Sequence, residues 1–293
     1  MKIINAILSV AVAVALLLTG CAIGKDGQSD SSSSLQTASE ALPVIKPDKS
    51  LTEKLRYIVH GGGALTAKDD YGYERSFAGS SSLEGITACA AAGVTAIELD
   101  FNFTSDGHLA CVHHWGNEYH SSFSADAPPT LEEFLKCKIY NNFTSICLDD
   151  VAQFMRENPE IVIITDIKDR NVEGSAYIAK NAPDLVDRFI IQIYDKSEYQ
   201  DVRSYGFDNI IYTLYALNWN EKNDFATIGK FARSNPLVGI TFDHSLCSVE
   251  GYTENMLKIG VPVFVHTVNE SDMINGYFAD GISGVYTDNI INY

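Results

Sequence analysis

The sequence predicts an α/β fold, a single-domain (β/α)8 TIM barrel with a small extra hairpin after the second strand. Three observations support this class. From residue 55 onward, short runs rich in β-branched residues alternate with stretches of helical spacing. The runs are almost continuously apolar, as in parallel strands buried on both faces. Polar groups follow the ends of many different runs, as expected for a barrel of about 250 residues.

The N-terminal segment is expected to lie outside the barrel. Residues 1–20 combine one lysine with an apolar run, which is typical of a signal peptide. The residues from Leu18 to Cys21 resemble the lipobox of bacterial lipoproteins, in which the cysteine is lipidated; an ordinary signal with a chance cysteine is the alternative. Residues 21–50 are rich in serine, as in a flexible tether. The sequence thus predicts a lipid anchor on Cys21 at the extracytoplasmic face of the cell membrane, followed by a barrel over 51–293.

Nine apolar runs are expected to form strands, eight in the barrel and one, at 109–112, as the arm of an extra hairpin. The runs lie at 56–59, 94–101, 109–112, 161–167, 189–194, 209–215, 237–242, 261–265 and 283–287. Between most of them lie stretches with helical spacing, including 82–93, 148–159, 196–206 and 270–281.

Local signals predict where some of these helices begin and end. Ser81 and Glu84 are spaced as a capping box for the helix over 82–93, which is expected to end at Gly93. Pro159 is expected to stop the second helix, and Asn269 to cap the last one.

Charge and cysteine content restrict function and compartment. The formal net charge of -17 argues against binding of nucleic acid, and it repels an anionic substrate unless the site itself is locally positive. Five cysteines follow Cys21, an odd number that cannot be fully paired. Cys89 and Cys111 lie in apolar patterns typical of buried thiols. Cys137 with Cys147 is the one plausible short-range disulfide.

Carboxylates gather at the ends of two expected strands. Because side chains of equal parity share one face of a strand, Glu98 and Asp100 point into the barrel mouth, about 7 Å apart. By the same argument Asp166 and Lys168 point inward together. Burying such carboxylates without a partner is costly, and oxygen ligands suit Mg2+ or Ca2+. The pattern therefore predicts one divalent cation, with a salt-bridge cluster as the alternative.

Two histidines follow strands on either side of this group in chain order, His60 after the first run and His113 after the hairpin arm. Imidazoles beside a metal-held anion form an acid and base pair that can work near neutral pH. Gln192 and His244 face the mouth by parity alone and are not assigned.

The roles of one aromatic segment and one glycine-rich segment are not assigned by the sequence. Trp115, Tyr119 and Phe123 either line a substrate wall or cover the hairpin, with equal weight. The glycines at 61–63 indicate tight backbone turns more than a phosphate-binding nest.

Several segments, in order, resemble the glycerophosphodiester phosphodiesterase family over about residues 55–290. They are HGGG (60–63), SLEG (82–85), AAGVTAIELDFNFTSDGHLACVHHW (91–115), TDIK (165–168), IQIY (191–194), PVFVHTVN (262–269) and GVYTD (284–288). The resemblance implies a metal-dependent phosphodiesterase on a (β/α)8 barrel, a phosphoric diester hydrolase that releases glycerol phosphate and an alcohol.

The resemblance also implies a role for each of six residues. It implies that one divalent ion, Mg2+ or Ca2+, is held by Glu98, Asp100 and Asp166. It implies that the general acid and base are His60 and His113, in an order that it does not assign. It also implies that Lys168 contacts the phosphate.

Four positions depart from the family pattern and indicate a divergent member. The family has Arg where this chain has Gly61, Glu where it has Asp166, Asp where it has His114, and Trp where it has His266. The first change removes a bidentate phosphate contact.

Other functions remain open at this point. A degenerate barrel lipoprotein could bind a phosphodiester or cell-wall polymer without turnover. A glycoside hydrolase would use two carboxylates about 5 to 9.5 Å apart and no metal. A relative that cleaves phospholipid head groups would share the same catalytic residues.

Overall fold

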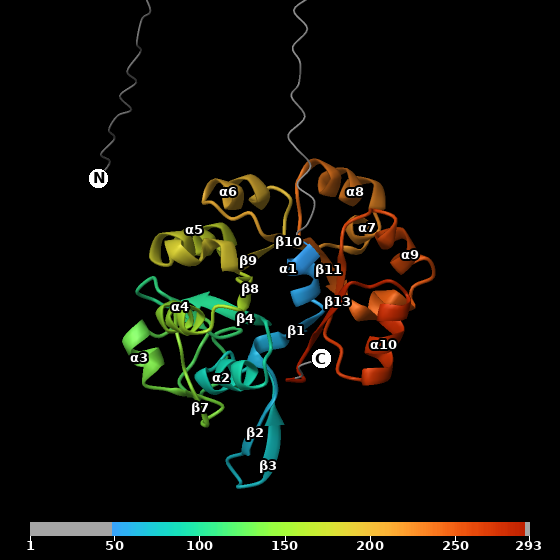
Figure 1. The fold of residues 1–293 in the computed structure, drawn as a ribbon. Helices are drawn as coiled ribbons and strands as arrows, with labels where there is room; N and C mark the ends of the chain where they lie inside the picture. The colour runs from blue at the N-terminus through green and yellow to red at the C-terminus, as the bar shows by residue number, and fades with distance from the viewer. Residues whose placement is uncertain (1–48, 291–293) are drawn as a thin grey trace, which may run out of the picture. The chain divides into compact units, whose positions relative to one another are not determined.

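Eight parallel strands close into a barrel in the computed structural model, which describes residues 49–290 (Figure 1). The strands are β1 (Tyr57–Val59), β4 (Ala96–Phe103), β8 (Val162–Asp166), β9 (Phe189–Ile193), β10 (Ile210–Thr213), β11 (Gly239–Asp243), β12 (Val263–His266) and β13 (Gly284–Thr287). Each pairs with the next in chain order, and β13 pairs with β1 to close the ring. The predicted (β/α)8 barrel is confirmed.

Most of the helices surround the strands as an outer ring, whereas α1 (Lys49–Lys54) lies near the centre of the ring in this view (Figure 1). The other α-helices are α2 (Leu83–Ala91), α3 (Leu131–Leu135), α4 (Leu148–Glu157), α5 (Asn171–Asn181), α6 (Glu198–Ser204), α7 (Trp219–Lys222), α8 (Phe225–Ser234), α9 (Tyr252–Leu257) and α10 (Ser271–Ala279). The 3-10 turns are η1 (His60–Gly62), η2 (Pro183–Arg188) and η3 (His244–Ser248).

The start of α2 differs from the predicted capping box. Ser82, not Ser81, is the N-cap, and its hydroxyl accepts a hydrogen bond from Gly85 N. Ser81 has a positive φ of 44° and lies before the helix. Glu84 instead accepts hydrogen bonds from the backbone N–H and the hydroxyl of Thr144. The side chain that was expected to cap the helix therefore makes a tertiary contact. The ends predicted at Gly93 and before Pro159 agree with α2 and α4.

Strand parity separates two apolar layers. The interior of the barrel is filled by a cluster that includes Ile58, Ala96, Ile164 and Phe264. The other face of the strands packs on the helices through side chains such as Ile97. Burying one such side chain contributes about 1.5–3 kcal/mol. The inward positions of β4 and β8 therefore run from an apolar floor to a polar mouth.

The extra hairpin arm is also present. β5 (Leu109–Cys111) pairs antiparallel with β4, on the edge of β4 opposite β8. A further hairpin pairs β2 (Leu65–Lys68) with β3 (Glu74–Phe77). It was not expected, because its side chains are mostly exposed and polar and form no apolar run. A short third sheet joins β6 (Lys138–Ile139) to β7 (Phe143–Thr144).

The predicted disulfide is wrong. Cys137 and Cys147 are both free thiols, as are the other cysteines of the described chain. Cys137 follows α3 and its thiol donates to the Glu133 carbonyl, whereas Cys147 occupies the N-cap of α4. The signal peptide, Cys21 and the tether up to residue 48 lie outside the described residues. Among residues 49–290, every helix is too short or too polar to cross a bilayer.

Gly239 tests the packing of the barrel floor. A Cβ at this position would meet the ring of Phe264 and lie 2.6 Å from the Pro262 carbonyl oxygen, which belongs to the backbone and cannot move aside cheaply. We expect Gly239→Ala to lower the free energy of unfolding by about 1–3 kcal/mol, measured by urea denaturation.

Gly276→Ala is the matched control. Gly276 lies inside α10 with nothing within 4 Å of the added Cβ. This substitution should raise stability by about 0.5–1 kcal/mol, because alanine favours the helix. Equal effects of the two substitutions would contradict the packing described for Gly239.

Candidate active site

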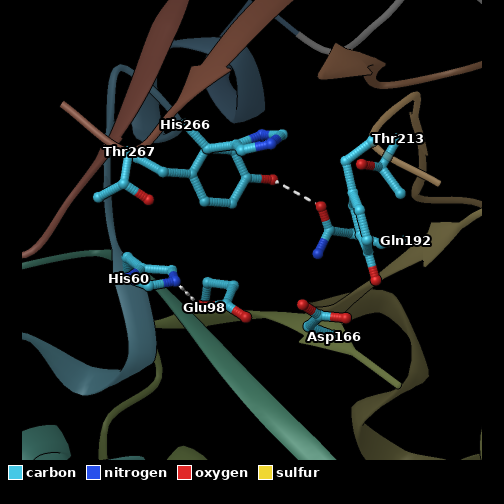
Figure 2. A pocket seen from close by; sticks show the side chains of 9 residues that line it. His60, Glu98, Asp166, Gln192, Thr213, His266 and Thr267 are labelled. Atoms are coloured by element: carbon cyan, nitrogen blue, oxygen red, sulfur yellow. Dashed lines mark hydrogen bonds and ion pairs between the residues drawn. The ribbon is translucent and has the colours of Figure 1, made fainter. Parts of the chain in front are cut away.

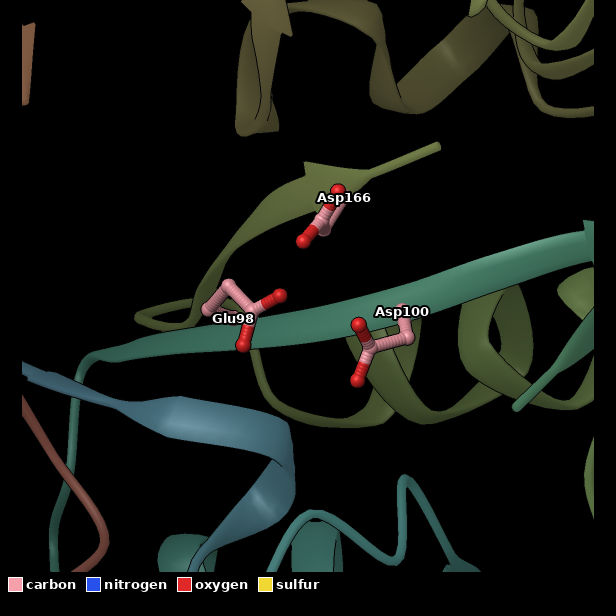
Figure 3. A group of neighbouring side chains, drawn as sticks. All are labelled: Glu98, Asp100 and Asp166. Carbon is pink, nitrogen blue, oxygen red and sulfur yellow. The ribbon is translucent and has the colours of Figure 1, made fainter. Parts of the chain in front are cut away.

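Three carboxylates converge at the mouth of the barrel (Figure 3). Glu98 and Asp100 share the inward face of β4, and Asp166 at the end of β8 is level with Asp100 in the strand register. Glu98 is 2% exposed and Asp100 is 1% exposed. One oxygen from each of the three lies within 4.8 Å of the others. The structure therefore brings together the three residues predicted as metal ligands.

Burial and mutual repulsion raise the pKa values of Glu98 and Asp166 above the usual range. Burial is the larger cause, followed by the charge of Asp100. Lys168 offsets part of this charge: its ammonium lies 3.0 Å from Asp100 Oδ1 and 2.9 Å from Asp166 Oδ2. Burial alone would lower the pKa of Lys168, but the two aspartates raise it. Three clustered carboxylates with one ammonium suit a hard divalent cation, so the donor set fits the predicted ion.

His60 lies directly beyond β1, between two carboxylates. Its Nδ1 is 2.8 Å from Asp288 Oδ1, and its Nε2 is 4.0 Å from Glu98 Oε2. Burial alone would lower the pKa of His60, but the hydrogen bond to Asp288 and the charges of Glu98 and Asp100 raise it to about 9. Without a bound ion, this imidazole is protonated at neutral pH.

Asp288 and Asn269 form a support for His60 that the sequence did not reveal. Asn269 was expected to cap α10, but the N-cap is Glu270. The Asn269 amide donates to Asp288 Oδ2 at 2.8 Å, and its oxygen accepts from Asp288 N and from the Thr287 hydroxyl. The position of Asp288 just after the last strand was a signal for this role.

The glycine turn after His60 fixes a carboxylate. Gly61 N donates to Glu98 Oε2 at 2.8 Å, and Gly61 has a positive φ of 55°. A Cβ here would overlap the Cα of Gly79, so an arginine cannot occupy the position without moving backbone. The close approach of Gly79 thus leaves room only for glycine at position 61.

His113 reaches the same edge of β4 from the opposite direction. β1 pairs with β4 at Val59 and Ile97, whereas β5 runs antiparallel and places Cys111 level with Phe101. His113 continues two residues further toward the end of β1. Burial lowers its pKa, against the charge of Asp100, so its imidazole is neutral at pH 7. The two predicted histidines therefore flank the carboxylates, in opposite protonation states.

An open pocket of about 320 Å³ adjoins these groups (Figure 2). Its lining is His60, Glu98, Asp166, Gln192, Thr213, Tyr215, His266, Thr267 and Tyr286. Asp100, His113 and Lys168 are not among its lining residues.

The far wall of the pocket is polar but uncharged. The Gln192 amide donates to the Thr165 carbonyl, and its oxygen accepts from the Tyr286 hydroxyl at 3.1 Å. His266 contacts the Thr241 hydroxyl at 3.0 Å, and burial lowers its pKa to about 4. His266 is therefore neutral at pH 7. Strand parity predicted that Gln192 faces the mouth of the barrel, but it did not show that Gln192 lines the pocket.

The other open assignments are resolved by packing. Trp115, Tyr119 and Phe123 are buried in an apolar cluster with Phe134 and with Ala110 of β5, so they cover the hairpin instead of lining the pocket. His244 contacts the Tyr277 hydroxyl and lies outside the pocket lining.

The support from Asp288 can be tested by titrating His60. In protein freed of metal by a chelator, Asp288→Asn should lower the pKa of His60 from about 9 toward its ordinary value of about 6.5 or below, because the negative partner is lost while burial remains. The measurement is an NMR titration of histidine-labelled protein. Asp243→Asn, a matched change at the end of β11, should leave the His60 titration in place. A His60 pKa that is the same in both variants would refute the role of Asp288.

Comparison with known proteins supports the fold. The chain matches no protein-family model. No curated protein sequence matches it either. Among solved structures, a glycerophosphodiester phosphodiesterase from Thermotoga maritima superposes with a TM-score of 0.61 at 16% identity, covering 80% of this chain and 95% of that one. One from Parabacteroides distasonis gives 0.59 at 14%, covering 85% and 90%.

A third solved structure with a similar fold contains a bound product. An Oleispira antarctica phosphodiesterase, solved in complex with the product sn-glycerol-3-phosphate, gives a TM-score of 0.59 at 13% identity, covering 80% of this chain and 94% of that one. The chain therefore has the same barrel fold as solved structures described as glycerophosphodiester phosphodiesterases, the family that its sequence segments resemble.

Proposed function

We propose that the protein is a metal-dependent phosphodiesterase that hydrolyses glycerophosphodiesters, or related phospholipid head-group diesters, to glycerol phosphate and an alcohol. The observation that carries this proposal is the convergence of two buried carboxylates and one partly buried carboxylate, one ammonium and two imidazoles at the mouth of the barrel. The product complex of the Oleispira antarctica protein, which has the same fold, supports a glycerophosphate product.

Acid and base roles follow from the protonation states. His60, whose Nδ1 lies 2.8 Å from Asp288 Oδ1, would donate a proton to the leaving alcohol, because this carboxylate favours the protonated imidazole. His113, which burial keeps neutral, is suited to accept the proton of the attacking hydroxyl group. The attacking group would be the neighbouring glycerol hydroxyl, so that its attack on phosphorus forms a cyclic phosphate and releases the alcohol, which takes the His60 proton. Water would then open the cyclic phosphate, giving a proton to His60 while His113 returns its proton to the glycerol oxygen.

The carboxylates Glu98, Asp100 and Asp166 would hold one divalent cation, Mg2+ or Ca2+. When bound, the cation supplies positive charge against the phosphate oxygens. Lys168 adds a second positive charge beside the same carboxylates, from which it can meet an anionic group. The site would therefore attract an anion although the chain as a whole carries a net charge of -17.

The location of the enzyme is proposed from its first residues. A lipid on Cys21 would anchor the chain at the extracytoplasmic face of the cell membrane, with residues 21–50 as a spacer. This placement would bring the barrel close to phospholipid-derived diesters.

The proposed activity predicts release of glycerol 3-phosphate from a panel of glycerophosphodiesters in the presence of Mg2+ or Ca2+. His60→Ala and His113→Ala should each lower kcat by about 10²–10⁴-fold, because each removes one proton transfer. His120→Ala serves as a control, since His120 is on the segment after β5 and contacts Ser122 and Phe123.

Three outcomes would contradict the proposal. Release that persists in both variants would refute the acid and base assignment. Saturable binding without product would favour the binding-only barrel. Hydrolysis of a glycoside that is unaffected by EDTA would favour the glycoside hydrolase.

Cation binding should release protons. Because the pKa values of Glu98 and Asp166 are raised, part of the cluster is protonated near neutral pH, and the cation requires the ionised form. Calorimetric titration in two buffers of different ionisation enthalpy should show release of up to about one proton at pH 7, with affinity rising as pH rises. Glu98→Gln should abolish binding, whereas Glu254→Gln, at an exposed pair with Lys258, should not. An affinity independent of pH would contradict the expected linkage.

A further inference from the structure

The segment after β5 links His113 by hydrogen bonds to two side chains that the proposed mechanism does not use. Glu118 Oε1 contacts His114 Nε2, and His114 Nδ1 lies 2.6 Å from His113 Nδ1. The series begins at an exposed carboxylate and ends at one of the two imidazoles beside the carboxylate cluster.

Backbone geometry brings Glu118 back to His114. Gly116 N donates to the His114 carbonyl at 3.0 Å, and Tyr119 N donates to the Gly116 carbonyl at 3.1 Å, so the chain turns tightly between the two side chains. A Cβ at Gly116 would overlap the Glu118 carboxylate. The carboxylate therefore lies in space that only a glycine leaves free.

The two imidazole rings are held in place from several sides. His113 stacks on the Tyr119 ring at an interplanar angle of 26°, and His114 meets the same ring edge-on at 89°. Tyr119 is 9% exposed and is part of a buried cluster. The Asn102 amide donates to the carbonyls of Val112 and His113, both at 2.9 Å. Neither ring can turn over without breaking these contacts.

The direction of each hydrogen bond follows from the chemistry of its end. An ionised carboxylate can only accept, so His114 Nε2 carries the proton shared with Glu118. The Nδ1 of a neutral His114 then has a lone pair, and His113 Nδ1 must donate to it. This leaves the lone pair of His113 on Nε2.

We propose that Glu118 and His114 are positioning residues that hold His113 as the Nδ1–H tautomer, with Nε2 free to accept a proton. The inference rests on the proposed function for its catalytic meaning, since His113 is the proton acceptor there. When Nε2 gains a proton, the positive charge is shared through the Nδ1 contact with His114, and the Glu118 carboxylate balances it. A carboxylate that orients an imidazole in this way stabilises the imidazolium that forms.

The tautomer can be measured without any turnover. In full-length protein labelled with 15N histidine at pH 8, long-range 1H–15N NMR should show His113 with its proton on Nδ1; the spectrum of His113→Ala assigns the signals. In His114→Phe, which keeps a ring against Tyr119 but has no acceptor, His113 should change to the Nε2–H form. The same His113 tautomer in both proteins would overturn the proposal.

Kinetics on a diester substrate give a second readout. Glu118→Gln and His114→Phe should lower kcat by about 10–100-fold while KM changes little, and His114→Asp, which returns a carboxylate next to His113, should restore part of the loss. Glu132→Gln, at an exposed pair with Lys136, should leave kcat unchanged. Full kcat in Glu118→Gln would overturn the role of the carboxylate.

The two tests separate this inference from the proposed function. Absence of hydrolysis by the unaltered protein, together with the expected tautomer change in His114→Phe, would refute the phosphodiesterase reaction and support the positioning of His113. Glu118 is exposed, so Glu118→Gln should fold normally and keeps the proposal testable if the His114 variants fail to fold.

Discussion

Negative charge buried at the mouth of the barrel governs the arrangement of the site. Glu98, Asp100 and Asp166 lie close together with little access to water, and such a group is stable only when positive or hydrogen-donating partners surround it. The partners come from every side: the Lys168 ammonium, the backbone N–H of Gly61, and the Tyr194 hydroxyl, which donates to Asp166. A divalent cation would complete this set.

The two histidines beside this charge differ in their immediate neighbours. His60 has a dedicated carboxylate partner in Asp288 and is drawn toward the protonated state. His113 has an imidazole as its hydrogen-bond partner and loses its proton through burial. The two imidazoles therefore differ in protonation because their immediate neighbours differ.

Strand-level features and two helix ends could be predicted from the sequence, whereas helix N-caps and the cysteine pairing could not. Alternation along β4 and β8 placed Glu98, Asp100, Asp166 and Lys168 correctly, because side-chain direction in a strand depends on parity alone. The capping role expected for Asn269 failed because its amide found Asp288, a partner 19 residues away, and the disulfide expected between Cys137 and Cys147 ignored the tertiary positions of both thiols. Spacing in the sequence carries no information about such distant partners.

The antiparallel strand β5 lies outside the ring of parallel strands that forms the barrel, yet it positions one of the two imidazoles of the site. β5 occupies the edge of β4 that the short strand β1 leaves free, and it takes no part in closing the ring. A change in its length or register would move His113 while keeping all eight parallel pairings of the barrel. The scaffold can therefore remain constant through evolution while the placement of one imidazole is adjusted independently, by changes in a single segment outside the ring.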